Sequence, residues 1–369
     1  MSNRLQQLHD AGQSIWLDFI DRTILQNGDL ARRIRDDALT GMTSNPTIFE
    51  KALAEGSVYD DQLAALEGKG LTPGQIFEAI ETDDVRTACD LFRPVYDTTG
   101  GGDGYVSIEV SPELANDTEG TVAEAQRLWQ TVNRPNVLVK VPGTVDGAIA
   151  VRRLIAAGIN VNITLLFSLA AYERVIDAYL AGLADRISTG RPVTQIASVA
   201  SFFVSRVDTE VDKQLDAKGP AVAHLKGKAA IANAKLAYAL FQKRFAGPAW
   251  DVLSHKGARV QRPLWASTST KNPAYRDVMY VEQLIGPETV NTMPPATIDA
   301  FRDHGVVART VDADLDGARK TVDDIEAAGI SFQRVTDKLL VDGIALFQKS
   351  FDSLLAGITS KTQAVAARS

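Results

Sequence analysis

The chain of 369 residues has little of what several protein classes require. A single cysteine, Cys89, excludes an intrachain disulfide and is typical of a reducing compartment. The four histidines are far apart, and none has the spacing of a metal site. No apolar run approaches the length of a membrane span, and the N-terminus lacks the apolar core of a signal peptide. We therefore expect a cytoplasmic protein that holds no metal.

Positive charge is also scarce. The chain has 39 Lys and Arg residues against 46 Asp and Glu residues, a formal net charge of -7, and no basic run. This balance argues against nucleic acid and anionic membranes as partners, so an anionic substrate would need a local basic pocket. The glycine-rich run 100–104 precedes a strand-like segment, whereas a dinucleotide fingerprint follows a strand. We interpret this run as a turn.

Hydrophobic residues make up 45% of the chain, enough for a sizeable core, and short strand-like runs alternate with longer helical ones. Eight such strands separated by helices predict an α/β fold, a closed parallel (β/α)8 TIM barrel. A doubly wound open sheet is the main competitor. The predicted strands are Ser14–Phe19, Gly41–Asn45, Tyr105–Val110, Val137–Val141, Asn160–Phe167, Ser198–Val204, Pro263–Thr268 and Val290–Met293.

Apolar residues recur at helical spacing between these strands. Asn272 and Pro273 also indicate an N-cap and first turn for a helix over Ala274–Ile285. We expect a single barrel domain over residues 1–369, with a helical extension at about 331–360 packed on it and a frayed end over Gln363–Ser369. The segment Arg319–Ile358 could also serve as a partner surface. The other predicted helices include Asp117–Val132, Val145–Ala157, Ser168–Ile187 and Lys226–Phe245.

The strand-like run Val137–Val141 contains one lysine, Lys140, among aliphatic residues. Burying an ammonium group is costly, so this lysine must be paired or kept neutral for use as a nucleophile. The structural alternative is a lysine that reaches solvent or forms a salt bridge at the end of a strand.

Five of the predicted strands carry a polar residue late in the strand, on the parity opposite to the aliphatic residues. In a barrel, this parity faces the lumen, and the C-terminal ends of the strands form the mouth where barrel enzymes work. These side chains should therefore converge into a reactive amine with acid–base partners, although any one of them could be a structural hydrogen-bonding group. They are Asp18, Glu109, Lys140, Asn162 with Thr164, and Ser201.

In chain order, these strands resemble the transaldolase family, in its longer bacterial branch, over nearly the whole barrel. The resemblance implies a TIM barrel of the class I aldolase type with additional C-terminal helices, and catalysis without metal or organic cofactor. It rests on Trp16-Leu17-Asp18, Thr43-Ser44-Asn45-Pro46, Val106-Ser107-Ile108-Glu109-Val110, Val139-Lys140-Val141-Pro142, Asn162-Ile163-Thr164-Leu165-Leu166-Phe167-Ser168, Ser201-Phe202-Phe203-Val204-Ser205-Arg206 and Trp265-Ala266-Ser267-Thr268.

The resemblance also implies roles for the catalytic candidates. Lys140 would attack a ketose phosphate and form a Schiff base, whose iminium accepts electrons during carbon–carbon cleavage. Glu109 and Thr164 would hold a water molecule for the proton transfers. Asp18 would take the proton from the C4 hydroxyl. Alternatively, Asp18 could pair with Arg22, and the neighbouring Asp21 is a weaker candidate for the acid–base role.

Other residues match the family's substrate contacts. Asn45, Asn162 and Ser201 would bind the hydroxyls of a dihydroxyacetone unit. Phe203 would lie near the reacting centre, although filling the barrel is an equally good interpretation for this ring.

For the phosphate, the resemblance implies Arg206 after the sixth strand and Ser267 after the seventh. The chain departs from the better-known family pattern here, because Ser267 is followed by Thr-Ser-Thr-Lys rather than soon by a second arginine. Lys271 would substitute for it, or would be an ordinary surface lysine. Lysine is a point charge rather than a two-pronged donor, so the geometry of phosphate binding would change.

The expected reaction is the reversible transfer of a dihydroxyacetone unit between sugar phosphates, from sedoheptulose 7-phosphate or fructose 6-phosphate to glyceraldehyde 3-phosphate or erythrose 4-phosphate. It belongs to the non-oxidative pentose phosphate pathway. One alternative is an aldolase of the same fold that releases free dihydroxyacetone, and another is a non-catalytic barrel that binds sugar phosphate. The sequence leaves a homo-oligomer open.

Overall fold

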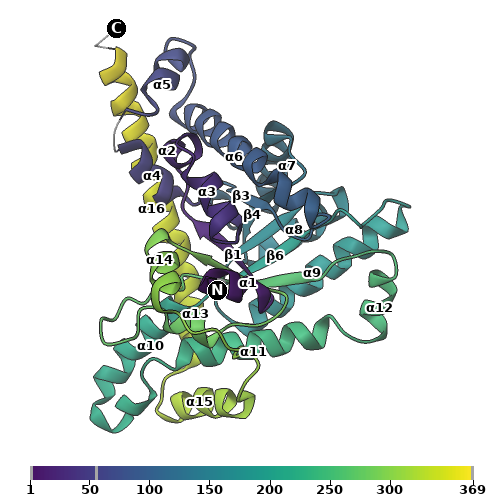
Figure 1. Cartoon of the computed structure of the whole chain (residues 1–369), viewed down its shortest axis with the longest axis vertical. Helices are drawn as coiled ribbons and strands as arrows, with labels where there is room; N and C mark the ends of the chain where they lie inside the picture. The colour runs from purple at the N-terminus through teal and green to yellow at the C-terminus, as the bar shows by residue number, and fades with distance from the viewer. Residues whose placement is uncertain (1–2, 55–56, 367–369) are drawn as a thin grey trace.

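The structure, a computed structural model, describes residues 3–54 and 57–366. At its centre, eight parallel strands form a closed barrel in sequence order (Figure 1). The closed ring confirms the predicted (β/α)8 barrel and excludes the open sheet. Each predicted strand overlaps an observed strand, and no bound differs by more than two residues. The strands are β1 (Gln13–Asp18), β2 (Leu39–Thr43), β3 (Tyr105–Glu109), β4 (Val137–Pro142), β5 (Val161–Leu166), β6 (Ser198–Phe203), β7 (Gln261–Ala266) and β8 (Thr289–Met293).

The register of the strands places several polar residues side by side. Glu109 of β3 is the partner of Lys140 in β4, and Lys140 is in turn the partner of Asn162 in β5. Thr164 pairs with Pro142 one pleat further along. Residues in register point to the same face of a sheet, so these side chains share the luminal face.

Helices surround the barrel, and most begin where the sequence predicts. The helix expected over Ala274–Ile285 is the exception, because only the short α13 (Met279–Gln283) forms there. The amide oxygen of Asn272 accepts from the backbone N–H of Ala274 at 3.0 Å, which closes a local turn instead of capping a helix. The prediction of an N-cap at Asn272 is therefore wrong.

The helices have the following bounds: α1 (Arg4–Asp10), α2 (Arg22–Gln26), α3 (Asp29–Asp36), α4 (Pro46–Ala54), α5 (Asp60–Leu66), α6 (Pro73–Thr98), α7 (Thr118–Val132), α8 (Val145–Ala157), α9 (Leu169–Ser188), α10 (Ser205–Lys218), α11 (Ala229–Arg244), α12 (Pro248–Ser254), α14 (Pro295–His304), α15 (Leu315–Ala327) and α16 (Phe332–Ala366), with 3-10 turns at Pro112–Leu114 and Pro220–Leu225.

A fully buried tryptophan of β1 packs directly against β2. Trp16 is fully buried, and its indole N–H donates to Asp103 at 2.9 Å. A Cβ added at Gly41 of β2 would lie 2.5 Å from the indole ring. Position 41 therefore has room only for glycine, because the ring occupies the space that any side chain would need.

Two helices follow the barrel. The first, α15, packs on α11, and the second, α16, runs from the neighbourhood of α10 past the end of β5 to α4 and α5 (Figure 1, yellow). The frayed end expected over Gln363–Ser369 is wrong as far as Ala366, which α16 includes, and residues 367–369 lie outside the described part of the chain. The C-terminal segment thus lies across the mouth of the barrel.

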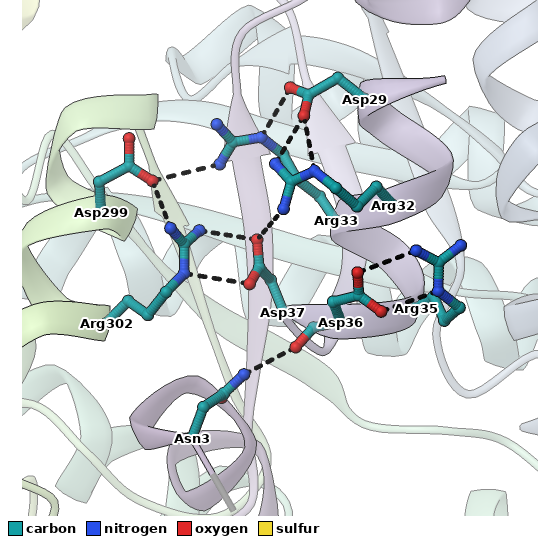
Figure 2. Close-up of polar contacts among 9 residues, drawn as sticks. All are labelled: Asn3, Asp29, Arg32, Arg33, Arg35, Asp36, Asp37, Asp299 and Arg302. Carbon is teal, nitrogen blue, oxygen red and sulfur yellow. Dashed lines mark hydrogen bonds and ion pairs between the residues drawn. The ribbon is translucent and has the colours of Figure 1, made fainter.

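On the outer surface, ion pairs join α3 to α14 (Figure 2). Arg302 of α14 donates two bonds to Asp37, at 3.0 and 2.7 Å, and pairs with Asp299 at 3.0 Å. Arg33 of α3 pairs with Asp29 at 3.0 Å and with Asp299 at 3.5 Å. Each of these two arginines thus pairs with two carboxylates of the same chain.

Within residues 3–54 and 57–366, no helix has the combination of length and apolar character needed to cross a bilayer. Over the same residues, no three His, Cys, Asp or Glu side chains come close enough together to hold a metal ion.

Candidate active site

A cavity of about 480 Å³ opens at the C-terminal ends of the strands. Its position agrees with the mouth predicted from strand parity. Two predicted site residues, Glu109 and Asn162, are not part of its lining and lie beneath it, buried. The predicted residues that line the cavity are Asp18, Asn45, Lys140, Thr164, Ser201, Phe203, Arg206, Ser267 and Lys271.

Lys140 reaches the cavity from β4, and its side chain is only 7% exposed. The Nζ atom donates to Oε2 of Glu109 at 3.0 Å and to the carbonyl oxygen of Ser44 at 2.9 Å. The amine therefore points into the mouth of the barrel rather than toward the outer helices. Its carboxylate partner is the one that the sequence places on the neighbouring strand.

The carboxyl group of Glu109 lies beneath the cavity, where burial raises its pKa and the ammonium of Lys140 opposes that shift. A raised pKa means that this group holds a proton more readily than an exposed glutamate does. Because only 3.0 Å separates its Oε2 from Nζ of Lys140, it can take a proton from the amine.

Asp18 stands at the end of β1, where burial raises its pKa. The hydroxyl of Thr43 donates to its Oδ1 at 2.8 Å, which is the main effect that opposes this rise. The same hydroxyl lies 2.6 Å from that of Thr292 on β8. Two threonines on the flanking strands thus hold the carboxylate in place.

The structure also decides between the alternatives for this carboxylate. Arg22 forms its salt bridge with Asp84 at 2.8 Å, not with Asp18. The side chain of Asp21 accepts from the backbone N–H of Ile24 and caps α2. Asp18 is therefore the carboxylate that faces the cavity at this position.

Two lining residues keep unused hydrogen-bonding capacity. The hydroxyl of Thr164 is buried and has no partner in the described part of the chain. Asn45 accepts from the backbone N–H of Ile48 at 3.1 Å, and no contact to its amide nitrogen is found among the described residues. A buried hydroxyl without a partner is costly, so a water molecule or a ligand is expected beside Thr164.

A short chain of side chains supports the floor of the cavity. Ser201 donates to the amide oxygen of Asn162 at 2.7 Å, and the amide nitrogen of Asn162 donates to Ser107 at 3.0 Å. Asn162 is fully buried, so only Ser201 of this chain reaches the cavity.

Arg206 lines the cavity from the start of α10, and its guanidinium lies over the ring of Phe203, with Cζ 5.0 Å from the ring centroid. Among residues 3–54 and 57–366, no hydrogen bond or ion pair to this guanidinium is found. Burial lowers its pKa, and the charges of Asp18 and Glu109 counteract this. A partly buried cation without a carboxylate partner is a site for an anion.

Two further predicted residues line the same cavity. Ser267 follows β7 with φ of 58°, a conformation that non-glycine residues rarely adopt, and its hydroxyl is 2.8 Å from that of Ser205. Lys271 lines the cavity but is exposed, and its Nζ donates to Ser269 at 2.7 Å.

The sequence interpretation missed several lining residues. Thr292 is a polar residue late in β8, and its register partner is Trp16, which shares the inward parity of Asp18. The parity argument could therefore have identified Thr292. Lys51 on α4, and Leu346 and Phe347 on α16, carry no comparable local signal. With Lys51, the lining contains four cations against one carboxylate, so an acidic protein has the local basic pocket that an anionic substrate needs.

Comparison with known proteins agrees with this geometry. A model of the family described as transaldolase/fructose-6-phosphate aldolase matches residues 15–358. The transaldolase of Thermobifida fusca is 50% identical over 367 residues, covering 99% of this chain and all of the other. The transaldolase of Acidothermus cellulolyticus is 49% identical over 360 residues, 97% of each chain. A protein of a Nostoc species named transaldolase 2 is 46% identical over 373 residues, 98% of each chain.

Proposed function

The chain belongs to the transaldolase/fructose-6-phosphate aldolase family, and from this membership and the mouth of its barrel we infer the reaction that it catalyses. It is a transaldolase, a transferase that moves a dihydroxyacetone unit between sugar phosphates. The donors are sedoheptulose 7-phosphate and fructose 6-phosphate, and the acceptors are glyceraldehyde 3-phosphate and erythrose 4-phosphate. The observation that carries this proposal is the inward Nζ of Lys140, 3.0 Å from Glu109 in a basic cavity.

The first step makes the nucleophile. Lys140 passes a proton to Glu109, whose raised pKa favours acceptance, and the free amine attacks the C2 carbonyl of the ketose. A water molecule between Glu109 and the unpaired hydroxyl of Thr164 relays protons while the carbinolamine loses water. The product is an iminium that joins C2 of the sugar to Nζ.

The second step breaks the carbon–carbon bond. Asp18, ionised and held by Thr43, takes the proton from the C4 hydroxyl. The C3–C4 bond then cleaves, and its electron pair moves into the iminium to give an enamine on Lys140. An aldose phosphate leaves with the new C4 aldehyde.

The third step is the reverse reaction with a different aldehyde. The enamine attacks the acceptor, Asp18 returns its proton to the new hydroxyl, and hydrolysis frees Lys140. In the interval, Asn45 and Ser201 bind the hydroxyls of the three-carbon unit, and Asn162 acts through Ser201, which it orients. Holding the enamine until an acceptor arrives makes the enzyme a transferase.

The phosphate of either substrate binds where Arg206 lines the cavity. Arg206 supplies the two-pronged donor, and Ser267 and Lys271 add a hydroxyl and a second charge. The ring of Phe203 supports the guanidinium. We also propose that the extension at about 331–360 folds with the barrel as one domain, because it contributes residues to this cavity.

The test is an assay of purified protein with fructose 6-phosphate and erythrose 4-phosphate. We expect glyceraldehyde 3-phosphate and sedoheptulose 7-phosphate in equal amounts, and free dihydroxyacetone at a much lower rate than transfer. An aldolase would release dihydroxyacetone at the full rate when erythrose 4-phosphate is left out. That result, or no turnover with any of these sugars, would overturn the proposal.

A further inference from the structure

The guanidinium of Arg206 lies near a second ring besides Phe203. Its Cζ atom is 5.0 Å from the centroid of Phe203 on β6 and 5.9 Å from the centroid of Phe347 on α16. Both distances fall within the range of cation–π contacts. Phe347 also lines the cavity. A residue of the C-terminal helix therefore contacts the cation that we assign to the substrate phosphate.

Contacts on both sides of Phe347 fix the course of α16 across the mouth. Before it, Lys338 pairs with Glu210 of α10 at 3.3 Å, one turn after Arg206. After it, the hydroxyl of Thr47 on α4 donates to Ser350 at 2.8 Å. Phe347 thus stands on a segment of α16 that is anchored to α10 on one side and to α4 on the other.

The backbone of α16 also approaches the guanidinium closely. A Cβ added at Gly343 would lie 2.9 Å from Cδ2 of Leu165 and 3.5 Å from Nη1 of Arg206. Gly343, one turn before Phe347, lets the helix come this near. The position of Arg206 is therefore limited by α16 as well as by β6.

Contacts with aromatic rings can hold the guanidinium of Arg206 and still leave it able to bind an anion. A carboxylate partner would occupy the N–H groups of Arg206 and cancel its charge, and none is found in residues 3–54 and 57–366. A ring holds the guanidinium through its π face and leaves the N–H groups free. Two rings can thus fix the direction in which the donors point without competing with phosphate.

We propose that Phe347 is a positioning residue that, together with Phe203, orients Arg206 toward the substrate phosphate. The C-terminal helix thereby takes part in selecting phosphorylated over unphosphorylated aldehydes. This inference rests on the proposed function and deepens it, because it concerns the substrate class of the same site.

The test compares two acceptors in the full-length enzyme, with fructose 6-phosphate as donor. In a double-displacement reaction, kcat/KM for the acceptor reports only the steps between the enamine and that acceptor. For Phe347→Leu we expect this constant to fall about 3- to 30-fold with glyceraldehyde 3-phosphate, mainly through KM, as loss of a cation–π contact implies. With D-glyceraldehyde, which has no phosphate, it should change less than about 2-fold. Phe347→Tyr keeps the ring and should restore most of the difference.

Phe351→Leu is the matched control, because Phe351 follows Phe347 by one turn of α16 and packs on Phe77 at 6.0 Å instead of on Arg206. This variant should leave the ratio between the two acceptors unchanged. If Phe347→Leu also leaves the ratio unchanged, or lowers both constants equally, the positioning role is wrong.

Binding of inorganic phosphate, measured by calorimetry, separates this inference from the proposed reaction. Phe347→Leu should weaken phosphate binding about 3- to 30-fold whether or not the protein turns over sugars. If the wild-type protein shows no turnover and the variant binds phosphate more weakly, the proposed reaction is wrong and the positioning role of Phe347 stands. If the wild-type protein turns over sugars and Phe347→Leu binds phosphate as tightly as the wild type, the positioning role is wrong and the proposed reaction stands.

Discussion

Arginines in two regions of this molecule have opposite surroundings. On the outer surface, Arg302 donates two bonds to Asp37, whose side chain is 5% exposed, and shares Asp299 with Arg33 (Figure 2). In the mouth of the barrel, Arg206 contacts two aromatic rings and, within the described residues, no carboxylate. The arginines on the outer surface are paired with carboxylates of the chain, whereas the N–H groups of Arg206 have no carboxylate partner in the described residues.

Partners separate structural charges from functional ones within this fold. A buried charge is tolerated when partners repay its desolvation, as the bonds from Arg302 do for Asp37. A partly buried charge without such partners costs stability, and it persists where a ligand supplies the missing interaction. Substitutions in the mouth should therefore lower activity with little loss of stability. Substitutions of the ion pairs between α3 and α14 should lower stability with little loss of activity.

The largest effect is expected for Lys140→Met. Turnover should fall at least on the order of 10⁴-fold, because the covalent route is lost. The free energy of unfolding should not decrease, because Glu109, whose pKa burial already raises, can become neutral when its partner is removed. Assay and urea denaturation check both statements, and a variant that unfolds at much lower urea would show that the pair is needed for stability.

Arg206→Lys tests the unpaired guanidinium itself. Loss of a charge-assisted bond, about 1.5–3 kcal/mol, should lower kcat/KM for phosphorylated substrates about 10- to 150-fold. The midpoint of thermal unfolding should stay the same or rise, because a flexible lysine can reach solvent. Unchanged kinetics would place the phosphate elsewhere in the cavity.

Asp37→Asn tests the paired charges on the outer surface, between α3 and α14. Neutralising the buried carboxylate that accepts two bonds from Arg302 should lower the free energy of unfolding by about 1–3 kcal/mol, with kcat/KM unchanged, although Arg302 keeps its pair with Asp299. Arg35→Ala is the control, because its pair with Asp36 is exposed, the arginine to 69%, and should contribute less than about 0.5 kcal/mol. Equal losses in the two variants would mean that burial of Asp37 has no special effect.

The smallest effect is a change in pH dependence for Thr43→Val. The hydroxyl of Thr43 lowers the pKa of Asp18 against the rise caused by burial, so removing it should raise that pKa further. Asp18 must be ionised to accept the C4 proton, and activity therefore falls as pH drops through its pKa. The acidic limb of kcat/KM should move to higher pH in the variant. A limb that stays in place, or moves to lower pH, would remove Asp18 from this role.

Much of the site could be predicted because a barrel converts sequence parity into position. Side chains alternate along a strand, so Asp18, Lys140 and Thr164 follow from the spacing of their neighbours, and the barrel places them at one mouth. Thr43 and Thr292 obey the same rule. A single threonine late in a strand is common, however, and only the structure shows that both hydroxyls lead to Asp18.

The remaining features depend on packing between distant segments. Periodicity predicts a helix around Phe347, but the direction in which α16 crosses the barrel is set by its contacts with α10 and α4. The burial of Asn162 under Ser201 likewise depends on the neighbouring strand. Around Asn272, the cap and proline signals were present, but the chain closes a turn there and the helix begins only at Met279.

The Schiff base on Lys140 is tested by reduction with borohydride in the presence of fructose 6-phosphate, followed by mass mapping of peptides. We expect one reduced three-carbon adduct, on Nζ of Lys140, formed in proportion to lost activity and absent from Lys140→Met. An active enzyme that gives no adduct, or an adduct on another lysine, would contradict it.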